Sequence, residues 1–222
     1  MRTRLEGIPR KRTYAAISIS VLLAAALAIS AGAAPPSGAL NLHVDLATIE
    51  FTRGQVPDGK HYMSTNPAQA YNRKFHDVSW YSHDTVMGAK VPTLHYGAHN
   101  HATYAIGPES PGTRGTFWTP AFAINSKSPC KLSFSHSYGL GDASRLISSV
   151  DILTFSYSFD GQFWVTEALP KPSVKIPWTT VNKAIPCQGH SALWLNWDFN
   201  TVDGAHNDGR GWNLKSFDLQ QD

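Results

Sequence analysis

Near its C-terminal end the chain reads Leu193-Trp194-Leu195-Asn196-Trp197-Asp198-Phe199. Every second position from Leu193 onward holds a large apolar side chain, whereas the positions between them hold a tryptophan, an asparagine and an aspartate. Successive side chains of a β-strand point to opposite faces. The stretch therefore predicts a strand with one face in a hydrophobic core and the other face on the outside.

The same period of two recurs on both sides of this strand. Lys131–His136 and Thr154–Phe159 alternate in the same way, and Trp212 begins a last strand that runs to Leu219. In that last strand the apolar phase slips by one residue before Phe217, which indicates a β-bulge. Asp160-Gly161 predicts a type I′ hairpin turn, with Gln162–Val165 as the returning strand.

The first half of the chain is less clearly patterned. Ala47–Phe51, Lys90–Tyr96 and Ala102–Ile106 are predicted strands, and Pro67–Phe75 is a short helix or a loop. Glycine and proline recur every few residues, and no long stretch keeps a helical period. These features predict an all-β fold, a jelly-roll-like antiparallel β-sandwich that forms one domain over residues 34–222.

Residues 1–33 have the features of a signal peptide. Five basic residues occur in the first twelve positions, an uncharged apolar stretch follows, and Ala31-Gly32-Ala33 supplies the small residues that signal peptidase requires. We expect cleavage before Ala34 and an extracellular or periplasmic location. The alternative is an uncleaved signal-anchor helix, since the apolar stretch is about long enough to span a bilayer.

The charge balance changes when this leader is removed. The whole chain carries 19 basic and 16 acidic residues, net +3, and five of the basic residues but only Glu6 of the acidic ones lie in the leader. The mature chain is therefore slightly acidic. This balance argues against nucleic acid as a partner and against a membrane surface beyond the leader.

The two cysteines, Cys130 and Cys187, are expected to form a disulfide. An even number of cysteines in an exported chain favours a bridge. There is no Cys-x-x-Cys motif, so we expect a structural rather than a redox role. Two buried free thiols are the alternative.

Four motifs in order resemble the MAM-like jelly-roll domains and the accessory modules of secreted bacterial metalloproteases of the immune-inhibitor class. They are Gly115–Phe122, Leu132-Ser133-Phe134, Ser158–Trp164 and Gly211–Leu219, with an apolar strand and a polar loop (Leu193–Asp208) before the last. The resemblance covers Gly115 to Leu219 and implies a jelly roll. The paired acids of the family's last strand are Lys215 and Ser216 here, so a role of that pair does not carry over.

Histidine and oxygen-rich segments are the candidate metal sites. His99 and His101 would share one face of a strand, a spacing that can hold zinc or copper, with His95 or a distant residue as third ligand. The alternative is a pair of surface histidines near a turn. Calcium is a possible cofactor in the loop after Trp197, because calcium takes six to eight oxygen ligands; an ordinary polar turn is the alternative. The candidate calcium ligands are Asp198, Asn200, Asp203 and Asp208.

Tryptophans are the candidate ligand-binding residues. All seven lie in the mature chain. Trp194 lies opposite the apolar face of its strand and is therefore the tryptophan predicted to face outward, and Trp178 is predicted at the start of a strand. For Trp164 and Trp212 the strand pattern favours the core, and packing is the alternative for every tryptophan.

No catalytic motif is recognisable. The sequence lacks a Gly-x-Ser-x-Gly nucleophile elbow, a His-Glu-x-x-His zinc helix and a phosphate-binding glycine loop. The mature chain has three glutamates, but its aspartates leave a pair of catalytic carboxylates open. We therefore expect a non-catalytic binding or adhesion module for a glycan or a cell-surface protein. The alternatives are a carbohydrate-active lyase or hydrolase and a structural surface or matrix component.

Overall fold

The computed structural model describes most of the mature chain. It covers residues 39–53, 57–65, 78–83, 92–98, 113–139, 151–170, 178–202 and 211–222. The leader, the segments 67–75 and 102–106, and the candidate ligands His99, His101, Asp203 and Asp208 lie outside the described residues. No helix in the described part is long and apolar enough to cross a membrane.

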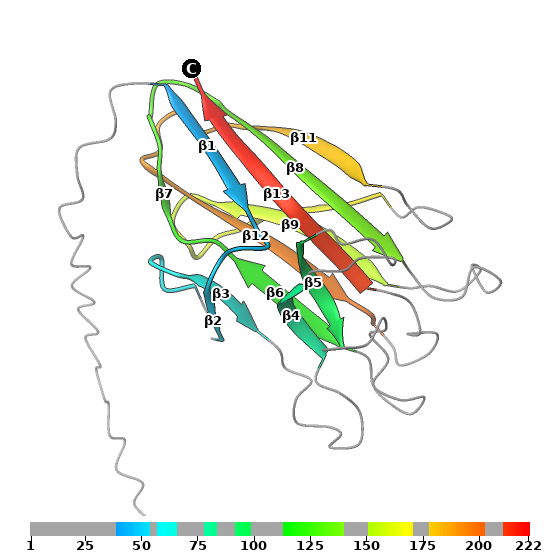
Figure 1. Cartoon of the computed structure of the whole chain (residues 1–222). Helices are drawn as coiled ribbons and strands as arrows, with labels where there is room; N and C mark the ends of the chain where they lie inside the picture. The colour runs from blue at the N-terminus through cyan, green and yellow to red at the C-terminus, as the bar shows by residue number, and fades with distance from the viewer. Residues whose placement is uncertain are drawn as a thin grey trace, which may run out of the picture. The chain divides into compact units, whose positions relative to one another are not determined.

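The described strands form two sheets that face each other, as the sequence predicts for a β-sandwich (Figure 1). The six-stranded sheet has the order β11 (Thr179–Ile185), β8 (Cys130–Gly139), β13 (Gly211–Gln221), β5 (Thr93–Ala98) and β4 (Val78–His83), and β1 (Leu40–Asp45) also pairs with β13. The seven-stranded sheet has the order β10 (Val165–Ala168), β9 (Ile152–Ser158), β12 (Ala192–Asn200), β6 (Arg114–Trp118), β3 (Tyr62–Thr65) and β2 (Phe51–Arg53), and β7 (Phe122–Ala123) also pairs with β12.

All strand pairs are antiparallel except the short β2–β3 pair. From β7 onward, successive described strands switch sheets at five places: β7 to β8, β8 to β9, β10 to β11, β11 to β12 and β12 to β13. The expected jelly-roll-like sandwich is thus confirmed.

The core lies between the two sheets and follows the alternation read from the sequence. On β12 the apolar residues of the alternating stretch are fully buried, and β9 contributes Leu153 and Phe155 from the same sheet. From the opposite sheet, Phe134 and Phe217 approach the indole of Trp197 at centroid distances of 5.7 Å each. Aromatic side chains from both sheets therefore join them across the interior.

The last strand, β13, lies along β8 over its whole length and contains the predicted bulge. Its register with β8 shifts between Leu214 and Ser216, so Lys215 is the extra residue. The bulge divides the other edge of β13: the part before it pairs with β5 and the part after it pairs with β1. The carbonyl oxygen of Lys215 accepts a hydrogen bond from the amide of Leu46 at 2.9 Å.

The predicted two-residue hairpin at Asp160-Gly161 is wrong in its details. β9 ends at Ser158 and β10 begins at Val165, so a longer loop replaces the turn, and only Gly161 has a positive φ (+72°) among the non-strand residues between them. The carboxylate of Asp160 accepts hydrogen bonds from the amides of Gln162 and Phe163, each at 2.8 Å. These hydrogen bonds from the loop backbone to the Asp160 side chain stabilise the longer loop in place of a two-residue turn.

Two further expectations are corrected. Residues 47–50 are not strand, and a turn after β1 precedes β2, which begins only at Phe51. The oxygens of Asp45 stabilise that turn by accepting bonds from the amide of Ala47 and the hydroxyl of Thr48, each at 3.0 Å. Trp164 is half-buried in the loop before β10 and does not lie in a core strand.

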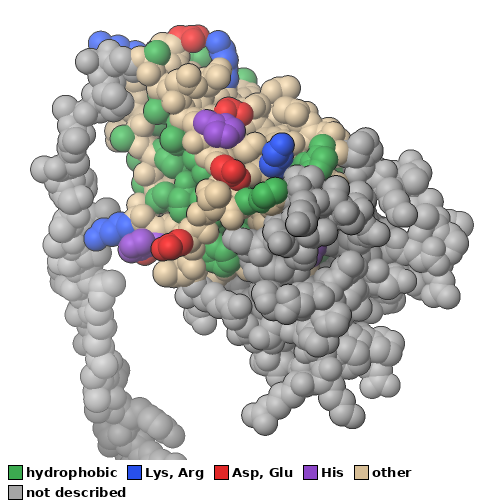
Figure 2. Space-filling model, viewed as in Figure 1, with side chains coloured by type: hydrophobic (Ala, Val, Ile, Leu, Met, Phe, Trp, Pro, Cys, Tyr) green, Lys and Arg blue, Asp and Glu red, His purple; other side chains and the backbone are tan. Residues whose placement is uncertain are grey.

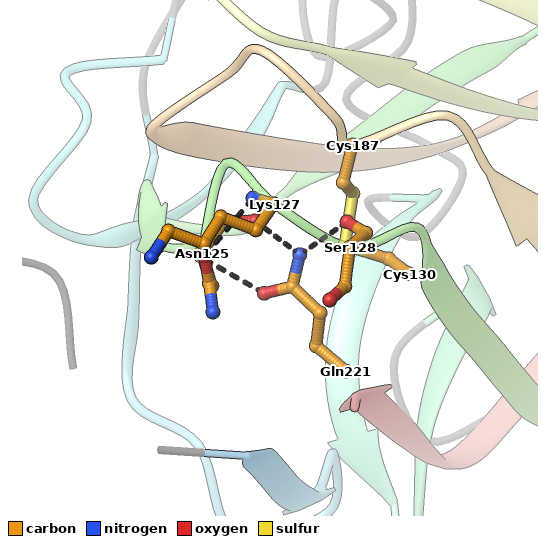
Figure 3. The surroundings of a disulfide bond; sticks show 6 residues. All are labelled: Asn125, Lys127, Ser128, Cys130, Cys187 and Gln221. Atoms are coloured by element: carbon orange, nitrogen blue, oxygen red, sulfur yellow. Dashed lines mark hydrogen bonds between the residues drawn. A yellow bond between two sulfur atoms is a disulfide. The ribbon is translucent and has the colours of Figure 1, made fainter. Parts of the chain in front are cut away.

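The predicted disulfide joins Cys130 at the start of β8 to Cys187 after β11. Gln221, at the end of β13, lies beside it (Figure 3). The Gln221 amide accepts a bond from the backbone N–H of Asn125 and donates to the carbonyl oxygens of Asn125 and Ser128. The disulfide and this amide together fix the β7–β8 loop to the end of the six-stranded sheet.

We expect loss of the disulfide to lower the free energy of unfolding by about 4 kcal/mol, because the bridge constrains a long loop of the unfolded chain. The variant Cys130→Ala/Cys187→Ala, compared with the oxidised protein by urea unfolding, measures the difference. An unchanged midpoint and slope would show that the bridge does not contribute to stability.

Acid should destabilise the fold through His136. This side chain is 3% exposed, and burial lowers its pKa to about 4 from the usual 6.5. In the unfolded chain the His136 imidazole is protonated below about pH 6.5, whereas in the folded chain it is protonated only below about pH 4. Stability is therefore lost as the pH falls through that interval. We expect a loss of about 3 kcal/mol from this group.

Urea unfolding from pH 7 to pH 4 tests this, with His136→Phe as the control. The phenylalanine variant is expected to lose this part of the pH dependence, although it also removes the acceptor for the Nε1–H of Trp212, which donates to His136 at 3.2 Å. An identical pH slope in both proteins would contradict the assignment.

Candidate ligand-binding face

The outer face of the seven-stranded sheet carries a row of four side chains from β12. They project away from the core because they alternate with its buried apolar residues, and they are Trp194, Asn196, Asp198 and Asn200. We call this row the β12 strip. Consecutive members lie about 7 Å apart along an extended strand, so the strip extends across much of the sheet.

Asn196 lies in the middle of the strip between two tryptophans. Trp118 of β6 is its cross-strand neighbour on one side, Ser156 of β9 is its neighbour on the other, and Trp194 lies two residues before it. Asn196 is only 6% exposed. No described residue forms a hydrogen bond with its side-chain amide, and the amide is not among the side-chain groups that are fully withdrawn from solvent.

Asp198 is held by two residues of β6. Its carboxylate accepts bonds from the Nε–H of Arg114 at 2.8 and 3.1 Å and from the hydroxyl of Thr116 at 2.6 Å. The Asp198 side chain is 9% exposed and the Arg114 side chain 61% exposed. The pair therefore neutralises the buried carboxylate and leaves most of the guanidinium at the surface.

Two loops from distant parts of the sequence meet at Trp194. A Cβ built on Gly59 would lie 3.6 Å from the indole Nε1 of Trp194, and one built on Gly161 would lie 3.5 Å from its Cε2. Both glycines have positive φ. The half-buried indole thus has both loops beside it, and any other residue at Gly59 or Gly161 would strain the loop backbone because of the positive φ.

An aspartate orders each of these loops. Asp58 accepts bonds from the amides of Lys60 and His61, and the His61 ring bond together with these amides lowers the Asp58 pKa to about 2. The amides of Phe163 and Gln162 lower the pKa of Asp160 in the same way. The Asp160 loop presents Phe163 with 80% of its surface exposed. Two pre-ordered loops therefore border the Trp194 end of the β12 strip.

The predicted ligand-binding tryptophans do not form one platform. Trp178 directly precedes β11, as predicted, and is half-buried, but it belongs to the six-stranded sheet. Trp194 lies on the outer face of the other sheet, as its position in the strand predicts. Trp212 is fully buried, which confirms the expectation for that residue. The second tryptophan beside the β12 strip is not Trp178 but Trp118, which pairs with Asn196.

The two described members of the predicted calcium set have other partners. Asp198 binds Arg114 and Thr116, and the Asn200 side-chain oxygen accepts a bond from the amide of Val202 at 2.9 Å. His95, the suggested third metal ligand, is buried, with its Nδ1 2.7 Å from the Asn213 side-chain oxygen. Within the described ranges, no group of three or more His, Cys, Asp or Glu side chains is placed to hold a metal ion.

The sequence reading missed Trp118 and Arg114 as site residues. Both lie on β6 and reach the site only through its pairing with β12, in which Trp118 opposes Asn196 and Arg114 opposes Asn200. Because β6 and β12 are about eighty residues apart in the chain, no local sequence pattern predicts that they pair. The alternation in Arg114–Trp118 could have shown that these two side chains share a face, but not which strand lies beside them.

Neither a family model nor a curated protein matches the chain. Among solved structures, TmCBM61 in complex with β-1,4-galactotriose aligns over 72% of this chain and 88% of its own, at 6% identity and a TM-score of 0.42. A cleaved adhesin domain of Lys-gingipain from Porphyromonas gingivalis aligns over 82% and 95%, at 10% identity and 0.42. The C-terminal CBM6 of LamC, a laminarinase from Zobellia galactanivorans, aligns over 81% and 98%, at 13% and 0.39.

The structures that the chain resembles thus include carbohydrate-binding modules and an adhesin domain. Identities and TM-scores this low leave the function to be argued from the residues of the site.

We expect Arg114→Met to lower the free energy of unfolding by about 1 to 3 kcal/mol, because it leaves the nearly buried carboxylate of Asp198 with Thr116 alone. Urea unfolding at pH 7 measures the loss. The double variant Arg114→Met/Asp198→Asn also removes the charge of the Asp198 side chain, and it should recover part of the lost free energy of unfolding. Equal stability of Arg114→Met and the parent protein would contradict the proposed pairing.

Proposed function

We propose that the protein is a secreted, non-catalytic module that binds a glycan along the β12 strip. The observation that supports this most directly is the Asn196 side chain, which is more than nine-tenths buried, has no hydrogen-bond partner among the described residues, and lies between Trp118 and Trp194. A bound ligand with hydroxyl groups would satisfy this amide.

The chemistry of the neighbours suits a sugar. A pyranose ring has apolar C–H faces and a rim of hydroxyl groups, so it is bound by aromatic rings together with a few oriented polar groups. Trp118 and Trp194 supply the rings, and Asn196 supplies both a donor and an acceptor. The exposed part of the Arg114 guanidinium adds further donors beside Asn200.

The charge on this face favours a neutral glycan and binding rather than hydrolysis. Asp198 is the one carboxylate on the outer face of the described strands of this sheet, and it is paired with Arg114. Two-carboxylate glycoside hydrolysis needs a second acid at a defined separation. The Arg114–Asp198 pair also leaves no uncompensated charge that would select an anionic sugar.

Export is part of the proposal. The basic N-terminal region, the uncharged stretch and Ala31-Gly32-Ala33 support a signal peptide cleaved before Ala34. Such export would present the β12 strip to glycans outside the cell or in the periplasm.

Residues 34–222, produced by export so that the disulfide forms, should bind neutral glycans on an array and in calorimetric titration. We expect Asn196→Ala and Trp118→Ala each to weaken binding at least tenfold, because loss of a hydrogen bond or a stacking contact with the ligand should cost about 1.4 kcal/mol or more. Thermal unfolding of each variant checks that the fold is retained.

Trp178→Ala is the matched control, since it removes a half-buried tryptophan from the other sheet. It should bind like the parent protein. Equal affinity of the Asn196→Ala, Trp118→Ala and parent proteins would refute the assignment of the site, and no binding to any glycan would refute the function.

A further inference from the structure

The six-stranded sheet has a hollow of its own on the side of the molecule opposite the β12 strip. It has a volume of about 430 Å³ and lies over β11, β8 and β13 near the disulfide end. This volume falls within the range of small-ligand sites, about 300 to 1,000 Å³. The side chains that project into it from the outer face are Lys131, Ser133, Asn182, Ala184, Asp218 and Gln220.

The hollow exists because small side chains form its floor. Ser133 and Ala184 project outward at its centre, whereas Lys131, Asn182 and Gln220 are longer and form its border. In the register of the sheet, Asn182, Ser133 and Asp218 stand side by side on three adjacent strands. A ligand lying across these strands would meet an amide, a hydroxyl and a carboxylate in turn.

Ionisable side chains around the hollow have polar partners. The Asp218 carboxylate contacts the Nδ1 of His43 at 2.7 Å, and the Lys131 ammonium contacts the Asp222 carboxylate at 2.9 Å. Figure 2 shows histidine, acidic and basic side chains interspersed among hydrophobic and other residues, with no concentration of one charge sign on the coloured part of the view. A strongly anionic or cationic ligand would therefore gain little there.

The polar groups that remain are amides and a hydroxyl. Within the described part of the chain, the side-chain amides of Asn182 and Gln220 have no hydrogen-bond partner, and the Ser133 hydroxyl has only a long contact of 3.5 Å to Asp218. Each amide offers donors and an acceptor. A neutral ligand with many hydroxyl groups matches this set, and a hydrophobic ligand does not.

The residues do not form a nucleophilic site. The Ser133 hydroxyl faces Asp218, and His43 contacts the other oxygen of the same carboxylate. The imidazole therefore stands on the far side of the aspartate and cannot take a proton from the serine, as a catalytic base must.

We propose that this hollow is a second saccharide site, so that the protein holds one neutral glycan on each outer face of the sandwich. The inference goes beyond the proposed function, because it assigns a second binding surface and, with it, the ability to join two glycan chains. Two sites on opposite faces cannot grip one short oligosaccharide together, but they can join two separate chains. The protein would then cross-link a neutral polysaccharide as well as bind it.

The test is a titration of the ¹⁵N-labelled residues 34–222 with maltohexaose, cellohexaose and xylohexaose, followed by amide chemical shifts. For at least one of these sugars we expect saturable shifts in two separate groups of residues, one along β12 and β6 and one at residues 131–133, 182–184 and 218–220. Calorimetry with that sugar should give a stoichiometry near two.

Two variants separate the sites. Ser133→Tyr fills the hollow with a ring that the outer face of a strand tolerates, although Ser133 is half-buried, and it should abolish the second group of shifts and lower the stoichiometry to one. Asn196→Ala should do the reverse. Ser135→Tyr, on the same face of β8 but outside the hollow, is the control and should keep both sites.

The possible outcomes are distinct. Shifts along β12 alone, or a Ser133→Tyr variant that still binds two sugars, overturn the second site and leave the proposed function standing. Shifts at the hollow alone support the second site and overturn the assignment of the β12 strip. If no sugar causes shifts in either group, both proposals are wrong.

Discussion

The packing of Trp197 between the two sheets is the interaction on which the rest of the structure depends. Its indole lies within 6.0 Å, centroid to centroid, of Phe117 and Phe155 in its own sheet and of Phe134 and Phe217 in the other. A strand that buries Trp197 must turn Asn196 to the opposite face, because the side-chain period is two. One strand register therefore places the core residues of β12 on the inner face and the candidate site residues on the outer face. A slip of one residue would turn each set to the opposite face.

The outer face of the seven-stranded sheet departs from the usual solvated pattern of a sandwich. On the seven-stranded sheet, Ser156, Ser158, Asn196 and Asp198 are each less than 10% exposed although they point away from the core. Arg114 and Thr116 compensate Asp198, and Thr166 lies 2.8 Å from the Ser156 hydroxyl, but Asn196 has no such compensation in the described structure. Its amide, which has no partner in the described structure, is therefore available to a ligand that lies on this face.

The sequence predicts those elements whose pattern lies within a short stretch of neighbouring residues or in a simple residue count. The strands of the second half, the bulge before Phe217, the disulfide and the outward position of Trp194 follow from periodicity, phase and cysteine count, because each depends on neighbouring residues or on a simple inventory. The alternation of Leu40–Asp45 is as long as that of Lys131–His136, so β1 also contains a local signal, although the prediction above does not include it. The prediction of a strand at Ala47–Phe51 is wrong because the side chain of Asp45 stabilises a turn there. Trp118 and Arg114 became site residues only through the pairing of β6 with β12, which depends on the packing of the whole domain.

The most direct test of this account is hydroxyl-radical footprinting of the tryptophans, read by mass spectrometry with and without a bound glycan. The account predicts that Trp197 stays unmodified in the folded protein, whereas Trp118 and Trp194 are modified and become protected when the glycan binds. Modification of Trp197 at the level of Trp118 would contradict the register, and labelling of Trp118 that a saturating glycan leaves unchanged would contradict the site.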